Sequence, residues 1–133
     1  SVVQTTPYFG GGIDSSEISG VNSCLVTGER NGAWYLYNVL DNGFLCFSII
    51  PMDTIDDWDW AVYNLTNFPC DSIFFVATME VSCNFHSGFG VTGANGLPGN
   101  QNEPVIPVLS GEKYVIYVSR FPNPEQKAVY SEL

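Results

Sequence analysis

The fold of this chain is decided by residues 53–66, which read DTIDDWDWAVYNLT. From Asp57 onward polar and apolar residues alternate, and an extended strand sends successive side chains to opposite faces. The pattern therefore predicts a strand with one face in a core and one face in solvent. The inner face would hold Trp58, Trp60 and Val62, and the outer face Asp57, Asp59, Ala61 and Tyr63.

Size and composition limit the classes of protein to which this chain can belong. Its 133 residues suit one domain over 1–133, and 45% hydrophobic with 14% charged residues is a globular composition. A net charge of −10 leaves no basic surface for nucleic acid. No apolar run approaches the roughly 20 residues that span a bilayer, so we expect no membrane insertion. The chain starts at Ser1 without an initiator Met or signal sequence, so we expect a processed or excised module.

About eight short apolar segments separated by turn residues predict strands, and no segment has a helical period. They cover residues 21–25, 33–39, 44–50, 57–66, 74–84 (as 74–79 and 81–84), 105–109, 113–119 and 127–133. Asn42-Gly43 is typical of a two-residue hairpin turn. Residues 1–20 would be a loose N-terminal segment and residues 84–102 a long Gly- and Asn-rich loop. The prediction is an all-β, antiparallel, two-sheet sandwich.

The four cysteines, at positions 24, 46, 70 and 83, allow three disulfide connectivities and contain no CxxC pair for structural zinc. Cys70 and Cys83 flank one apolar segment, which favours a bridge between them. Cys24 and Cys46 would then pair across the strand that contains Trp34. An even number of cysteines in a chain with few lysines indicates an oxidising, extracellular location.

A series of motifs carries a resemblance to a known class of module. They are DWDWAVYNLT (57–66), CDSI (70–73), VSCN (81–84), TGANG (92–96) and LSGEKYVIYVSRF (109–121). Over about residues 21–133 the chain resembles β-sandwich modules of large surface adhesins and secreted proteins that gliding Bacteroidota export by the type IX secretion system. These modules are similar to CUB and pre-peptidase C-terminal domains. The resemblance implies a jelly-roll-like fold and a non-catalytic, adhesive role in gliding motility or at the cell surface.

The acidic residues predict a calcium site, because calcium takes hard oxygen ligands. The candidate ligands are Asp53, Asp56, Asp57 and Asp59. Some CUB relatives hold calcium through acids at strand ends, and the resemblance places Asp57 and Asp59 at the matching positions. The alternative is that the four acids are simply solvated and discourage edge pairing.

Ligand recognition is predicted on the long loop and on the aspartate face. Tyr63 shares that face, and Phe89 and Asn95 lie in the loop. Core packing explains the three tryptophans better than sugar stacking does. The resemblance also implies O-glycosylation at the Asp-Thr/Ser-apolar sites of Thr54 and Ser72.

Catalytic patterns are missing from the sequence. His86 is the single histidine, and no nucleophile-elbow motif surrounds it. Adjacent aspartates in a small sandwich suit the two facing carboxylates of a glycosidase poorly. We therefore expect a non-enzymatic, extracellular adhesion or ligand-binding module that meets a glycan, a surface or neighbouring domains of its own chain. The alternatives are an accessory, carbohydrate-binding domain of a secreted hydrolase and a structural spacer in a multidomain fibre.

Overall fold

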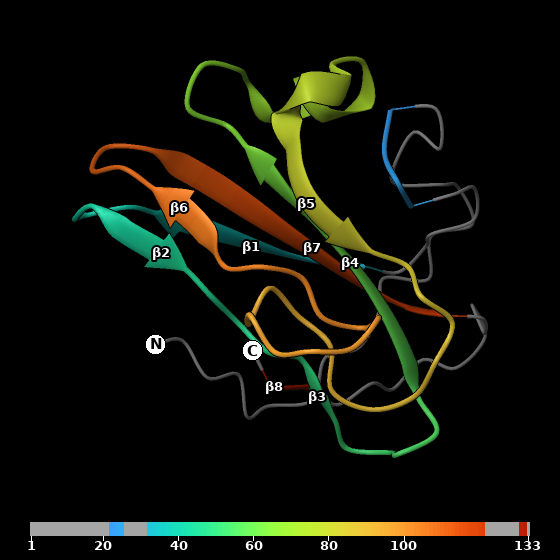
Figure 1. Cartoon of the computed structure of the whole chain (residues 1–133). Coiled ribbons are helices and arrows are strands. Elements are labelled where there is room, and N and C mark those ends of the chain that lie inside the picture. Colours follow the sequence, from blue (N-terminus) through green and yellow to red (C-terminus); the bar gives the residue numbers. More distant parts are fainter. Residues whose placement is uncertain (1–21, 26–31, 122–130, 133) are drawn as a thin grey trace.

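The computed structural model describes residues 22–25, 32–121 and 131–132, which form an antiparallel all-β structure. Eight strands and two 3₁₀ helices occur within these ranges (Figure 1). The strands are β1 (Ala33–Asn38), β2 (Gly43–Leu45), β3 (Ile50–Pro51), β4 (Asp57–Asn64), β5 (Glu80–Asn84), β6 (Ile106–Val108), β7 (Lys113–Phe121) and β8 (Ser131–Glu132). The helices are η1 (Cys70–Phe74) and η2 (Ala77–Met79). The all-β class is confirmed.

Several predicted segments differ from the observed elements. Residues 22–25 form a bend instead of a strand, and the apolar stretch 74–79 lies mostly in η1 and η2. The N-terminal segment 1–20 and most of the predicted strand 127–133 lie outside the described residues. Neither short helix of the described part is long and apolar enough to cross a membrane.

The main sheet has the strand order β1-β7-β4-β5. β7 pairs with β4 along the whole of β4, from Asp57 opposite Phe121 to Asn64 opposite Tyr114. β2 pairs with β6, and β3 with β8, in two separate two-stranded sheets. The Asn42-Gly43 turn therefore connects strands of different sheets, and the predicted hairpin is wrong. Asn42 Oδ1 instead accepts a hydrogen bond from the Ser110 amide at 2.8 Å. This bond joins the turn at Asn42 to the turn at residues 110–111.

A core lies on each face of the main sheet. The first contains Trp58, Trp60 and Val62 from β4, covered by Leu45 of β2, by Ile106 and Val108 of β6, and by Ile49 and Ala94 from irregular segments. In Figure 1, β2 and β6 lie together in front of β1 and β7. The cover on this face is thus a two-stranded ladder plus irregular chain.

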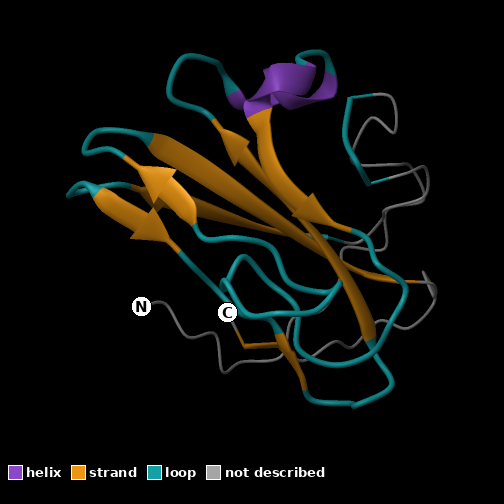
Figure 2. Cartoon of the chain, in the orientation of Figure 1, coloured by secondary structure: helices purple, strands orange, loops and turns teal. Residues whose placement is uncertain are grey.

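The second core joins Ala61 and Tyr63 of β4 to Leu25, to Ile73 of η1 and to Met79 of η2. The two helices lie together at one end of the main sheet (Figure 2). Trp34 on the edge strand β1 contacts this core through Tyr117, with ring centroids 4.5 Å apart, but stays 39% exposed. The prediction of core packing holds for Trp58 and Trp60 and is wrong in part for Trp34.

Candidate functional site: a polar pocket at the end of β5

The acidic residues of β4 are buried, contrary to the predicted solvated face. Asp57 is 8% exposed and Asp59 is 5% exposed. β4 is an inner strand between β7 and β5, and the chain that follows β5 returns to it. Alternation predicted which side chains share a face, but the second face is covered as well.

The charge of Asp56 has a cationic partner, whereas the charge of Asp57 is compensated only in part. Asp56 is 6% exposed and forms an ion pair with Arg120. Asp57 accepts a hydrogen bond from the Gly88 amide and lies near His86. Burial nevertheless raises the pKa of the Asp57 carboxyl, because desolvation outweighs both effects. Its Oδ1 is buried and has no hydrogen-bond partner among the described residues.

The four predicted calcium ligands do not form one cluster in the described part of the chain. Asp53 is exposed, and its Oδ1 accepts a hydrogen bond from the Ile55 amide within a turn. Asp56 is engaged by Arg120, which leaves Asp57 and Asp59 together on one face of β4. A calcium ion would have to complete its shell with oxygens other than these carboxylates.

An open pocket of about 340 Å³ lies where β5 ends and the long loop begins. Its lining residues come from the end of β5, from the first part of the loop, and from the last residues of the loop and the position directly after it. They are Cys83, Asn84, Phe85, His86, Ser87, Asn100 and Glu103. The pocket thus offers amide, carboxylate, hydroxyl and imidazole groups beside one aromatic ring.

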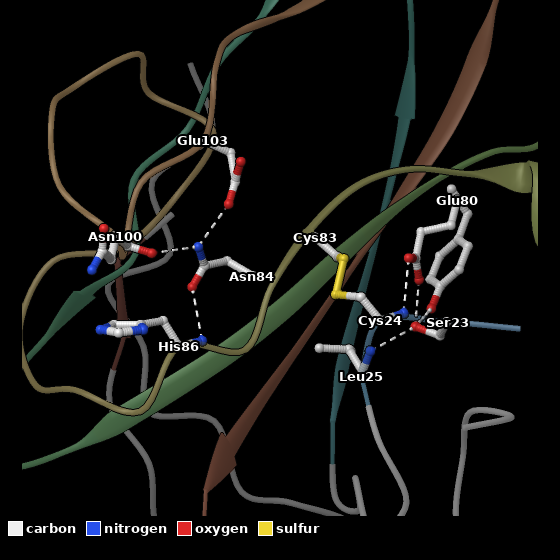
Figure 3. The surroundings of a disulfide bond; sticks show 10 residues. Ser23, Cys24, Leu25, Glu80, Cys83, Asn84, His86, Asn100 and Glu103 are labelled. Carbon is white, nitrogen blue, oxygen red and sulfur yellow. Dashed lines mark hydrogen bonds between the residues drawn. A yellow bond between two sulfur atoms is a disulfide. The ribbon is translucent and has the colours of Figure 1, made fainter. Parts of the chain in front are cut away.

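Asn84 organises this pocket (Figure 3). Its Nδ2 donates to Glu103 Oε1 at 2.8 Å and to the Asn100 carbonyl at 2.9 Å. Its Oδ1 accepts from the His86 amide at 3.1 Å. Asn84 is only 5% exposed, so these bonds hold both ends of the loop in fixed positions.

The middle of the long loop is part of the first core. Thr92 and Ala94 are 3% and 0% exposed. Trp60 Nε1 donates to Thr92 Oγ1 at 2.8 Å, and that hydroxyl donates to the Gln101 carbonyl at 2.5 Å. Gly93 passes so close to Phe47 that an added Cβ would lie 2.2 Å from its carbonyl oxygen. The loop is irregular, as predicted, but a structural part of the fold.

The predicted ligand-binding residues lie away from the pocket. Tyr63 is 1% exposed and its hydroxyl contacts Ser23 Oγ at 3.1 Å, so the predicted exposure of this side chain is wrong, and its role as a ligand contact stays a prediction. Phe89 is exposed, as expected, and its role as a ligand contact stays a prediction. Asn95 is half-buried and donates to Ser48 and Asn102, so it stabilises the loop.

The disulfide joins Cys24 to Cys83, whose Cα atoms are 6.4 Å apart. The predicted bridges Cys70–Cys83 and Cys24–Cys46 are both wrong, and Cys46 and Cys70 are exposed thiols. Residues 22–25 fold back onto β5, which brings Cys24 to Cys83 across 59 positions of sequence. Loop length along the chain was a poor guide, because this contact depends on tertiary packing.

The two predicted glycosylation residues differ in accessibility. Thr54 is exposed in the turn before β4, whereas Ser72 is half-buried within η1. The Ser72 amide donates to the Pro69 carbonyl. Thr54 is therefore the more accessible acceptor, and modification at either site stays a prediction.

Comparisons with known proteins leave the family open. No protein-family model matches the chain, and neither a curated protein nor a solved structure matches it. The residues that line the pocket must therefore carry the functional argument. Sequence reasoning missed Asn84 and Glu103, and the one signal for Asn84 was its place at the end of a strand.

Proposed function

We propose that this protein is a non-catalytic ligand-binding module of a larger secreted or cell-surface protein, built as a jelly-roll-like β-sandwich, that binds a glycan in the Asn84–Glu103 pocket. The observation that carries the proposal is the network around Asn84. It fixes polar groups in an open pocket before any ligand arrives, which lowers the entropic cost of binding.

A glycan suits the chemistry of this pocket. Ligand sites combine aromatic surface with a few fixed polar groups. Phe85 is 52% exposed and offers a ring, while Glu103, Ser87 and Asn100 can exchange hydrogen bonds with sugar hydroxyls. The net charge of −10 and the Glu103 carboxylate disfavour anionic ligands. A neutral or amino sugar is therefore the preferred class.

The lining residues favour binding over catalysis. Glycoside hydrolysis uses two carboxyl groups that flank the bond to be cleaved. Glu103 is the single carboxylate among the residues that line the pocket. His86 lines it too, and its backbone amide is held by Asn84 (Figure 3). The module would accordingly hold a glycan and leave its bonds intact.

Calcium is proposed as a stabilising ion at Asp57 and Asp59. Both carboxylates are buried on the same face of β4, and Asp57 Oδ1 has no hydrogen-bond partner within the described structure. A divalent cation would offset the repulsion and the desolvation of these charges. Calcium that binds only the native state should raise the melting temperature, and Asp59→Asn should remove most of that rise. Equal melting temperatures in calcium and in chelator would exclude the ion.

A glycan array, followed by calorimetry on the best ligand with and without calcium, tests the proposed function. Phe85→Ala should weaken binding at least tenfold, about 1.4 kcal/mol, because it removes the exposed ring of a residue that lines the pocket. Phe44→Ala is the matched control, since Phe44 is an exposed ring on β2, outside both the pocket lining and the long loop. An equal loss of glycan affinity in both variants would mean that the glycan binds outside this pocket. A folded protein that binds no glycan would favour a structural spacer.

A further inference from the structure

A second group of potential ligands contains the two cysteines of the disulfide and Glu80, which lies on the opposite side of the disulfide from the Asn84 network (Figure 3). The sulfur atoms of Cys24 and Cys83 and a carboxylate oxygen of Glu80 all lie within 4.8 Å of one another. All three residues are partly buried. Among the described residues this is the one group of three side chains placed to hold a metal ion.

A β-bulge creates this group. In a regular strand, residues three positions apart point to opposite faces. Cys83 lies opposite Ala61 and Glu80 opposite Tyr63, with a register shift between Val62 and Tyr63. The extra residue on β5 turns Glu80 and Cys83 to the same face, where residues 22–25 bring Cys24.

Hydrogen bonds join Glu80 to the segment that contains Cys24, in addition to the disulfide. Its Oε1 accepts from the Cys24 amide at 2.9 Å, and its Oε2 accepts from Ser23 Oγ. Ser23 Oγ also contacts the Tyr63 hydroxyl at 3.1 Å and accepts from the Leu25 amide at 3.1 Å. An ionised carboxylate has about four acceptor positions, so Glu80 keeps room for a cation. Cys24 would stay beside Cys83 after the S–S bond is broken.

We propose that the reduced protein binds one thiophilic divalent cation, such as zinc, through Cys24, Cys83 and Glu80. A thiol or phosphine reductant would supply two electrons to the S–S bond and become oxidised, and each sulfur would take up one proton. Zinc binding would then release both protons and leave two thiolate ligands. Thiolates favour zinc over calcium, so this site differs from the one proposed at Asp57 and Asp59.

The surroundings allow the ion to enter and to complete its shell. Cys83 also lines the open pocket, which gives solvent a route to one side of the group. Zinc with three protein ligands commonly takes water as the fourth. The disulfide and the metal would be mutually exclusive states of the same two cysteines, and the oxidised protein would bind no zinc there.

Zinc binding is tested in a Cys46→Ser/Cys70→Ser background, which removes the two exposed thiols. The protein is reduced with a phosphine, desalted without oxygen, and titrated with zinc against a chromophoric chelator. We expect about one zinc per reduced chain and none per oxidised chain. Cobalt should give the thiolate charge-transfer absorption of a tetrahedral site.

Variants identify the ligands. Cys83→Ser should abolish tight zinc binding, and Glu80→Gln should weaken it at least tenfold. Asp71→Asn, at an exposed carboxylate of η1, should bind zinc as the parent does. A folded, reduced protein that binds no zinc overturns the proposal, as does undiminished affinity in Cys83→Ser. If reduction unfolds the chain, zinc must restore the β-sheet circular dichroism, and failure to do so overturns it equally.

Discussion

Replacing Thr92 by valine should destabilise the protein by about 2–4 kcal/mol, although the two side chains have nearly the same shape. The Thr92 hydroxyl accepts from Trp60 Nε1 and donates to the Gln101 carbonyl. Trp60 is 0% exposed, so its indole N–H would lose the Thr92 acceptor in a dry core, at about 1–3 kcal/mol. The Gln101 carbonyl keeps a hydrogen bond from the Gly93 amide. Loss of its bond from Thr92 should therefore cost less, about 1 kcal/mol of stability.

Urea denaturation of the disulfide-intact protein measures this effect. With a slope of about 2 kcal/mol/M, the Thr92→Val midpoint should fall by about 1–2 M at unchanged slope. Thr92→Ser is the control, because it keeps the hydroxyl and removes one methyl group worth about 0.8 kcal/mol. Trp60→Phe, made both in the wild-type protein and in Thr92→Val, completes a double-mutant cycle.

Equal stability of Thr92→Val and Thr92→Ser, within about 0.5 kcal/mol, would refute the reasoning. It would mean that the indole N–H finds another partner, or that the loop lies more loosely on the core than its contacts indicate. A coupling energy near zero between positions 60 and 92 would lead to the same conclusion by an independent route.

Three further changes test other parts of the structure. Gly93→Ala should cost at least about 2 kcal/mol in urea melts through its backbone clash, whereas Gly43→Ala, with open space around it, should cost less than about 1. Because burial raises the pKa of the Asp57 carboxyl, its protonated form favours the native state, so stability should fall as pH rises from the ordinary value of 3.8 through the raised native pKa. Asp57→Asn should flatten that part of the pH profile in metal-free buffer, and an unchanged profile would contradict it. Peptide mapping of the unreduced protein should recover Cys24 linked to Cys83, and removing this bridge should cost about 4 kcal/mol for its 59-residue separation.

The class of the fold and the strand at its centre could be predicted from residue types. Alternation over residues 57–64 located β4 and directed Trp58 and Trp60 to one face, and both are buried there. The shortage of helical periodicity and the many turn residues predicted an all-β chain, and the structure confirms it. These features depend on residues that are only a few positions apart in the sequence. The two-residue period of a strand can be recognised over that short range.

The candidate sites were decided by tertiary structure. Alternation shows that Asp57 and Asp59 share a face, but only the packing of the chain around β4 decides that this face is buried. The bulge in β5 turns Glu80 toward Cys83, and the return of the loop brings Glu103 to Asn84. Such contacts join residues up to 59 positions apart, and many pairings of similar local quality compete for them. The pairing that forms is the one that buries the most apolar surface over the whole core. That total depends on the assembled fold and on no single segment of the sequence.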